Sequence, residues 1–163
     1  MAIKIYIDQG HNPQNPNAGA EGNGLREQDI VYPIGIELAA LLRANGNYEV
    51  RLSRPTPTTQ VGTSNTTSLR LRVSDANSWG ADYFISLHTN ASSQPSANGV
   101  EAFAFSEPSA AFSLGKDIVE SISAITGLNN RGMKTRSGLY VLRKTAMPSV
   151  LVELGFIDRK SVV

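Results

Sequence analysis

Cysteine is absent from this chain of 163 residues, and histidine occurs only twice. Without cysteine the protein forms neither disulfides nor thiolate metal sites, so any transition metal must be held by imidazole and carboxylate groups. No run of about 18 apolar residues occurs, which argues against insertion into a membrane through an apolar helix. The N-terminus lacks the basic, apolar and small-residue regions of a signal peptide, so we expect either another route of export or a trimmed segment.

Positive and negative charges are nearly balanced, with 15 lysines and arginines against 14 aspartates and glutamates. Aromatic residues make up only 7% of the chain and form no stripe interleaved with basic residues, so nucleic acid is not the expected partner. The chain also contains no Gly-x-Ser-x-Gly elbow, which argues against a serine hydrolase.

Strand-like apolar runs alternate with segments of helical periodicity, a pattern typical of an α/β domain. The length and the lack of an internal linker predict a single domain over residues 1–163, with an open, mostly parallel or mixed sheet of about six strands flanked by helices. Loops are expected at 10–24 and 55–67. The predicted strands are 3–9, 48–54, 83–88, 99–105, 138–143 and 149–156, and the predicted helices are 29–45, a segment after residue 67, and 109–126.

Both histidines lie at the carboxyl end of a predicted strand. His11 follows the apolar run that starts at Ile3, His88 ends the run that starts at Tyr83, and an asparagine comes soon after each. Open α/β sheets place their active sites at the carboxyl ends of strands, and imidazole is the commonest metal ligand. We therefore expect His11 and His88 to share one site.

A catalytic zinc site takes about three protein ligands, so the third ligand here should be an aspartate or a glutamate. Glu27 is better placed than Asp8, because it stands where the glycine-rich loop meets the first predicted helix. Asp8, three residues before His11, is better suited to orienting a loop or a ligand. The alternative for Glu27 is an ordinary acidic residue in a first helical turn, interacting with the helix dipole.

Glu153 is the most conspicuous acidic residue, because the surrounding run from residue 149 to 156 is otherwise apolar. Central strands rarely contain an acid that is neither paired nor functional. One interpretation is a buried ion pair with an arginine such as Arg143. The other is a general base or acid whose protonation is tuned by burial next to a metal.

Five segments, taken in order, resemble one known family. They read IDQGHN, GLREQDI, ISLHTN, NRGMK and LVELGF, and they extend over about residues 3–157. Each fragment alone is weakly specific, but five in the correct order on the expected elements make a strong match. The chain is similar to the zinc-dependent N-acetylmuramoyl-L-alanine amidases of bacterial cell walls and phage endolysins, the Amidase_3 family.

The resemblance implies that His11, Glu27 and His88 hold a zinc ion and that Glu153 is the catalytic glutamate. The implied reaction is hydrolysis of the amide between N-acetylmuramic acid and the L-alanine of the stem peptide, by an autolysin or endolysin that lyses or remodels the cell wall. The implied partner is peptidoglycan outside the cytoplasm, and we expect a monomer. Two features depart from the family. Gln9 replaces a usual proline, and the chain stops at Val163, so we expect the domain to lack its last helix.

The sequence is also compatible with several alternatives. The same ligands would suit a zinc peptidase that cuts within the stem peptide, and the fold would also suit a non-catalytic wall-binding domain. Asn90 is a candidate for substrate binding, although an asparagine at the end of a strand is equally typical of turns. Arg143 is a second candidate. With Arg131, Lys134 and Arg136, it either meets the acidic stem peptide or belongs to a solvated basic face.

Overall fold

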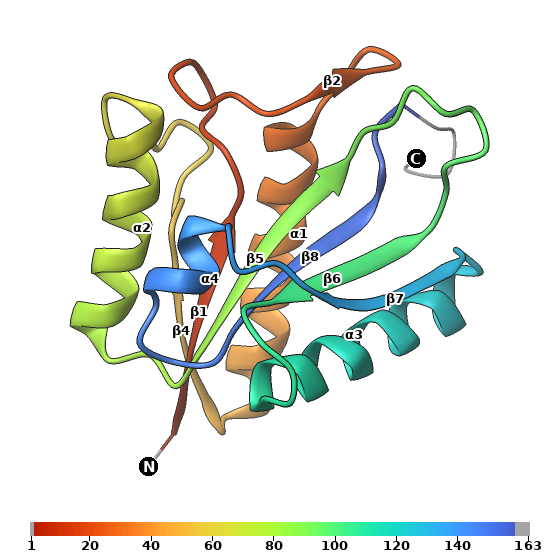
Figure 1. Cartoon of the computed structure of the whole chain (residues 1–163). Coiled ribbons are helices and arrows are strands. Elements are labelled where there is room, and N and C mark those ends of the chain that lie inside the picture. Colours follow the sequence, from red (N-terminus) through yellow and green to blue (C-terminus); the bar gives the residue numbers. More distant parts are fainter. Residues whose placement is uncertain (1, 159–163) are drawn as a thin grey trace.

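Helices and strands alternate along most of the chain in the computed structural model, which describes residues 2–158 (Figure 1). The elements are, in chain order, β1 (Ile3–Gln9), β2 (Glu21–Gly22), β3 (Leu25–Arg26), α1 (Glu27–Asn45), β4 (Tyr48–Leu52), α2 (Asn65–Trp79), β5 (Tyr83–Asn90), β6 (Val100–Ala104), α3 (Ala110–Thr126), β7 (Asn130–Thr135), α4 (Tyr140–Lys144) and β8 (Ser149–Phe156).

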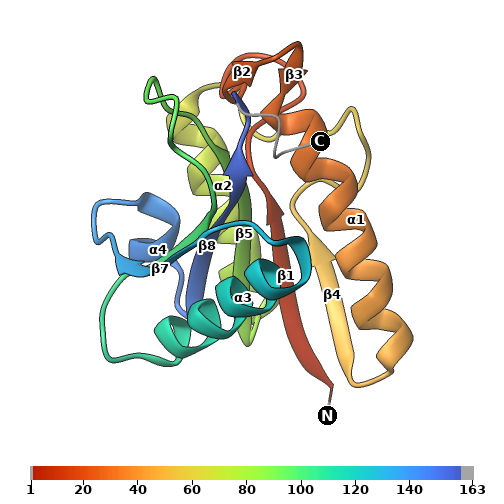
Figure 2. The same cartoon turned by 90° about the vertical axis from the view of Figure 1, so that its right-hand side faces the viewer.

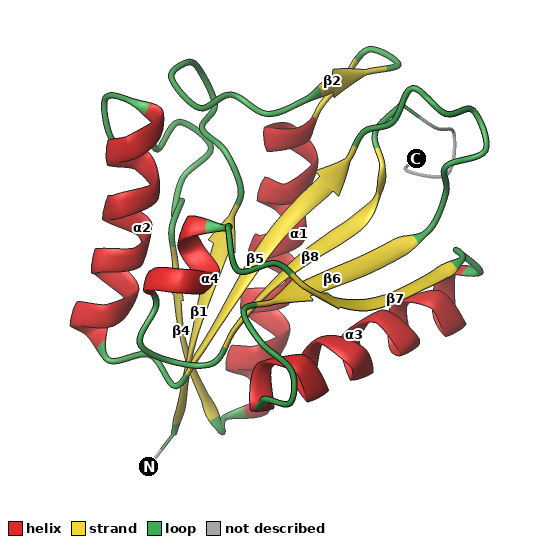
Figure 3. Ribbon diagram, in the orientation of Figure 1, coloured by secondary structure: helices red, strands yellow, loops and turns green. Residues whose placement is uncertain are grey.

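The main sheet has the strand order β4-β1-β5-β8-β6-β7. Strands β4, β1, β5 and β8 pair in parallel, β6 pairs antiparallel with β8, and β7 pairs in parallel with β6. The predicted mixed sheet of about six strands with flanking helices is therefore confirmed. In Figure 3 the loops that follow β1 and β5 rise above the carboxyl ends of the parallel strands.

Helices cover both faces of this sheet (Figures 1 and 2). On one face, α2 and α4 bury a cluster that includes Tyr6, Phe84 and Leu151. On the opposite face, α1 packs on β1 and β5, and α3 packs on β6 and β8. Because side chains alternate between the two faces along a strand, the polar residues next to these core positions are sorted to one face or the other.

Local sequence signals explain where the helices begin and end. The Ser64 hydroxyl accepts a hydrogen bond from the backbone N–H of Thr67 and caps the amino end of α2. Both α1 and α2 end at a glycine with positive φ, Gly46 and Gly80, a conformation that glycine adopts at no steric cost. Pro33 lies in the second turn of α1, and the helix continues through it.

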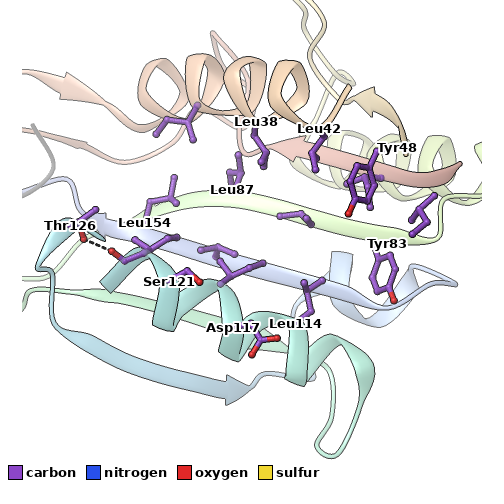
Figure 4. Close-up of a pocket in the computed structure, with 17 residues that line it drawn as sticks. Leu38, Leu42, Tyr48, Tyr83, Leu87, Leu114, Asp117, Ser121, Thr126 and Leu154 are labelled. Carbon is purple, nitrogen blue, oxygen red and sulfur yellow. Dashed lines mark hydrogen bonds between the residues drawn. The ribbon is translucent and has the colours of Figure 1, made fainter. Parts of the chain in front are cut away.

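Between α1 and α3 the sheet face is left open as an apolar hollow of about 870 Å³ (Figure 4). Leu38 and Leu42 of α1, Leu114 of α3, and Leu87 and Leu154 of the sheet contribute to its lining. Leu87 and Leu154 point to the face opposite that of their neighbours His88 and Glu153. The hollow is therefore separate from the polar cluster at the carboxyl ends of the strands.

Three local predictions were wrong. Residues 138–143, predicted as a strand, form a turn and most of α4, because a short apolar run with neighbouring buried residues, here Val141 and Leu142, fits either element. The sheet edge is instead occupied by β7, whose polar residues are typical of an edge strand but hid it from the hydrophobic pattern. The loop predicted at 10–24 also contains β2, which pairs with β3.

Element boundaries elsewhere differ from the predictions by a few residues. The first helix begins at Glu27 and not near Asp29, and α2 begins at Asn65, inside the loop predicted at 55–67. The expectation of a missing last helix falls on the end of the chain, beyond the described residues. Within residues 2–158, no helix combines the length and the apolar character needed to cross a membrane.

Candidate metal centre

The register of the parallel strands places the predicted site residues side by side. Leu87 pairs with Gln9 and His88 pairs with Glu153, so His88 and Glu153 lie side by side on β5 and β8, and Gly10, just after β1, lies beside them. On the far side of β8, Glu101 of β6 lies directly opposite Glu153. Side chains from widely separated parts of the sequence thus meet at the carboxyl edge of the sheet.

His11 is brought to these residues by the turn after β1. Its φ of 64° lies in the left-handed region, which is uncommon for a residue with a side chain and is typical of functional sites. Gly10 makes the approach possible, since a Cβ there would lie 2.5 Å from Cε1 of His88. The two imidazole rings consequently lie edge to face, with centroids 4.9 Å apart.

Glu27, the first residue of α1, places its carboxylate between the two histidines. Its Oε2 lies 3.2 Å from Nε2 of His11, and its Oε1 lies 3.1 Å from Nδ1 of His88. The backbone N–H groups of Ala20 and Thr89 each donate to one of these oxygens at 2.9 Å. Glu27 is therefore turned into the site, and does not act only as an exposed acid at a helix start.

The electrostatics of this group favour ionised Glu27. Burial opposes the charge, but hydrogen bonds from His11 and His88, together with their positive charge, hold the pKa of Glu27 well below its usual range. Burial likewise opposes the charge on His88, but Glu27 outweighs it and raises the pKa of His88. A cation is thus strongly favoured next to the Glu27 carboxylate.

Three observations indicate that His11, Glu27 and His88 can hold a metal ion. One ligand atom from each of His11, Glu27 and His88 lies within 4.8 Å of the others. Tetrahedral zinc with bonds of about 2.0–2.1 Å separates neighbouring ligand atoms by about 3.3 Å, close to the two histidine–carboxylate separations. Space is kept free by Gly19, where a Cβ would lie 2.8 Å from Oε2 of Glu27. The donor set and its spacing suit a divalent metal.

Glu153 lies beside this cluster with an unsatisfied carboxylate. Among residues 2–158 its buried Oε2 has no hydrogen-bond partner, and it forms no ion pair with an arginine. Burial, together with the negative charges of Glu27 and Glu101, raises the pKa of Glu153 to about 7, against the opposing positive charges of His88 and Arg136. The alternative interpretation, a buried pair with Arg143, does not match this arrangement.

A buried arginine that the sequence did not reveal supports the turn carrying His11. Arg72 of α2 donates to Oδ1 of Asp8 at 2.5 Å, and to the carbonyl oxygens of Gln9 and His11 at 2.7 Å each. It also donates to Oδ1 of Asn12 at 3.1 Å. The charge of Arg72 lowers the pKa of Asp8 despite complete burial. Asp8 therefore orients the loop through Arg72, in keeping with its expected orienting role.

Gln9, which stands where the resembled family usually has a proline, is also buried. Its Nε2 donates to the carbonyl oxygen of Arg54, and its Oε1 accepts from the backbone N–H of Arg54, each at 3.0 Å. Gly35 of α1 leaves room for this side chain, since a Cβ there would lie 2.4 Å from Cγ of Gln9. Gln9 ties β1 to the segment after β4 and takes no part in the cluster.

The two predicted substrate-binding residues lie in different surroundings. Nδ2 of Asn90 donates to Oε1 of Glu101 at 2.7 Å, and its Oδ1 accepts from the backbone N–H of Ala91, so both ends of this amide are engaged. Arg143 is exposed on α4, with its guanidinium 5.8 Å from the ring centroid of Tyr140. Neither residue belongs to the His11, Glu27 and His88 cluster.

Two histidines and a glutamate, grouped at the carboxyl ends of parallel strands beside a second, unpaired glutamate, are typical of metal-dependent hydrolases. Comparison with known proteins narrows this class. The sequence profile described as N-acetylmuramoyl-L-alanine amidase matches residues 5–162, and the chain belongs to this family, Amidase_3.

Individual relatives agree with this assignment. The chain is 38% identical to N-acetylmuramoyl-L-alanine amidase CwlM of Bacillus licheniformis, over 96% of this chain and 57% of that protein. It is 32% identical to an endolysin of Bacillus phage SPP1, over 98% of this chain and 57% of that protein. The crystal structure of an N-acetylmuramoyl-L-alanine amidase from Clostridium difficile 630 superposes with a TM-score of 0.86 at 28% identity, covering 98% of this chain and 83% of that one. The chain thus spans a little over half the length of these two curated relatives.

Proposed function

We propose that this domain hydrolyses the amide bond between N-acetylmuramic acid and the L-alanine of the stem peptide in peptidoglycan. The observation that carries the proposal is the row of His88 and Glu153 beside His11 and Glu27, in a chain that belongs to the amidase family. We further propose that the domain acts as a monomer on the cell wall outside the cytoplasm.

His11, Glu27 and His88 would hold a zinc ion, which suits a set of two imidazoles and one carboxylate. When bound, zinc supplies Lewis-acid activation of a water molecule and of the scissile carbonyl group. In the metal-free site the two histidine neighbours hold the pKa of Glu27 low, and the positive charge of a bound metal ion would keep the carboxylate ionised in their place. The backbone N–H groups of Ala20 and Thr89 fix the direction of its carboxylate.

Glu153 would move the proton. Its unpaired carboxylate accepts a proton from the attacking water, and the protonated acid then donates this proton to the nitrogen of the departing L-alanine. Burial raises the pKa of Glu153 to about 7 in the metal-free site, and a carboxyl group with a raised pKa suits both accepting and donating a proton. The reaction yields a free lactyl carboxyl group on the glycan and a stem peptide with a free N-terminal amine.

Mass spectrometry of a peptidoglycan digest tests this proposal. We expect intact stem peptides with a free L-alanine amine, together with glycan that has lost its peptides. Fragments in which L-alanine stays attached to the muramic acid would instead identify a peptidase that cuts within the stem. Peptidoglycan that is bound but not cut, under zinc-loaded conditions, would identify a wall-binding domain and refute the hydrolytic assignment.

A further inference from the structure

A charged cluster outside the proposed zinc ligands lies next to Glu153 on strands β6 and β7. At its centre is Glu101, which is 4% exposed and lies directly opposite Glu153. Nε of Arg131 donates to Oε2 of Glu101 at 3.2 Å, and the ammonium group of Lys134 contacts the same oxygen. Burial opposes the charge of Glu101, but Lys134 and Arg131 outweigh it and lower its pKa. Glu101 is an ionised anchor for two cations.

Positive charge exceeds negative charge in this cluster. Arg136 follows β7, is exposed, and lies with its guanidinium 5.5 Å from the ring centroid of Phe103. Within residues 2–158 its side chain forms no ion pair. Lys134 also lies near this ring, at 6.0 Å, and its side chain remains 43% exposed. An ammonium group has three donors and a guanidinium five, so both cations keep donors for a further anion.

The position of Glu153 between this cluster and the histidines sets the direction of the substrate. This step rests on the proposed function. Glu153 delivers its proton to the nitrogen of the departing L-alanine, so the peptide portion must extend on the side of Glu153. Across the sheet, that side leads from β8 to β6 and β7. The glycan portion then lies toward β1.

The chemistry of the two portions agrees with this direction. The lactyl carboxyl of N-acetylmuramic acid is consumed in the scissile amide, so its charge is lost, whereas the stem peptide carries free carboxylates. Neighbouring strands are about 4.8 Å apart, so Glu101 and the Lys134 ammonium group that contacts it lie about 5–10 Å beyond Glu153. An extended peptide covers this distance in about two to three residues.

We propose that Lys134 and Arg136 bind a carboxylate of the stem peptide two or three residues from the scissile bond, and that Glu101 is a positioning residue for Lys134. A guanidinium matches a carboxylate with two parallel hydrogen bonds, and Phe103 supports both cations from one side. The site would select acidic stem peptides over amidated ones.

A pair of synthetic substrates tests this proposal. Each is an N-acetylmuramoyl tripeptide, one with free carboxylates and one with every carboxylate converted to a carboxamide. We expect wild-type enzyme to prefer the acid by about tenfold or more in kcat/KM, mainly through KM. Arg136→Met should bring this preference close to 1, and Lys134→Met should reduce it while Lys134→Arg retains most of it. Lys116→Met, which removes a cation from α3 on the opposite face, is the control.

A second measurement separates binding from folding. Calorimetric titration of the metal-free protein with the acid tripeptide should show weaker binding in Arg136→Met, with a melting temperature close to that of wild type, because Arg136 is exposed and, among residues 2–158, forms no ion pair. Equal hydrolysis of the acid and amide substrates by wild type would overturn the carboxylate site while leaving the amidase activity established. An equal loss on both substrates in Arg136→Met would also overturn it. Hydrolysis of neither substrate by the wild type would overturn the proposed function and the inference together.

Discussion

Replacing Arg72 by methionine should destabilise the protein more than any comparable change at an exposed arginine. The Arg72 and Asp8 side chains are 1% and 2% exposed, and their ion pair is 2.5 Å long. Removal of one partner from a buried pair leaves an uncompensated charge, which typically costs about 3–5 kcal/mol. For a chain of this size, each kcal/mol lowers the melting temperature by about 2–4 °C, so we expect a decrease of roughly 6–20 °C.

Arg51→Met provides the matched control. Arg51 also pairs with an aspartate, Asp75, at 2.8 Å, but the two side chains are 44% and 45% exposed. Exposed pairs contribute at most about 1 kcal/mol, so this variant should unfold within a few degrees of wild type. Thermal and urea unfolding at pH 7, followed by circular dichroism, measures both. If Arg72→Met were no less stable than Arg51→Met, the importance assigned to the buried pair would be refuted.

The pH dependence of the same pair has a definite sign. Arg72 lowers the pKa of Asp8, so the pair contributes stability above the unfolded-state pKa and loses it as pH falls through the folded-state pKa. The stability difference between wild type and Arg72→Met should therefore shrink in the acid range. Because Arg72 also binds the carbonyl oxygen of His11, the variant should bind zinc about tenfold more weakly.

Three further predictions concern the cluster itself. Gly10→Ala should weaken zinc binding tenfold or more in an equilibrium titration, because its Cβ would meet His88, whereas Gly138→Ala, with no atom within 4 Å of the added Cβ, should not. Glu153→Gln should abolish release of stem peptides but keep zinc bound, and residual lysis at the wild-type rate would contradict the proton-transfer role. In the zinc-free protein, the raised pKa of Glu153 means that stability falls as pH rises from about 4.5 to about 7. Glu153→Gln should therefore gain stability over wild type across this range, by at most about 3 kcal/mol, and a constant difference in melting temperature from pH 5 to pH 8 would refute the shift.

The sequence predicted the parts of the site that depend on scarce residues and on strong hydrophobic runs. His11 and His88 could be placed because each follows an apolar strand, and Glu153 because an acid interrupts such a run. Glu27 followed from the lack of cysteine and from its position at the start of a helix. These signals come from the residues next to each position in the sequence. They therefore assign each site residue to a strand end or a helix start without knowledge of the three-dimensional fold.

Other features depend on contacts that no local pattern reveals. Arg72 lies within a helix where an arginine is ordinarily exposed, and only its distant partner Asp8 explains its burial. Asp8 gave a signal that could have been used, since an acid in an apolar strand requires a buried cation. Strand β7 was missed because polar residues at a sheet edge resemble a loop. Glu101 lies on a strand that was predicted, but its partners Arg131 and Lys134 come from β7 and could not be read from the sequence. The engagement of Asn90 with Glu101 likewise follows from strand pairing and not from sequence spacing.

The central claim is that His11, Glu27 and His88 together hold one zinc ion, and elemental analysis of purified protein tests it most directly. We expect close to one zinc per chain in wild type and in Glu153→Gln, and nearly none in His88→Ala dialysed under the same conditions. Full zinc occupancy in a folded His88→Ala variant, or zinc-free wild type that still releases stem peptides, would contradict the account.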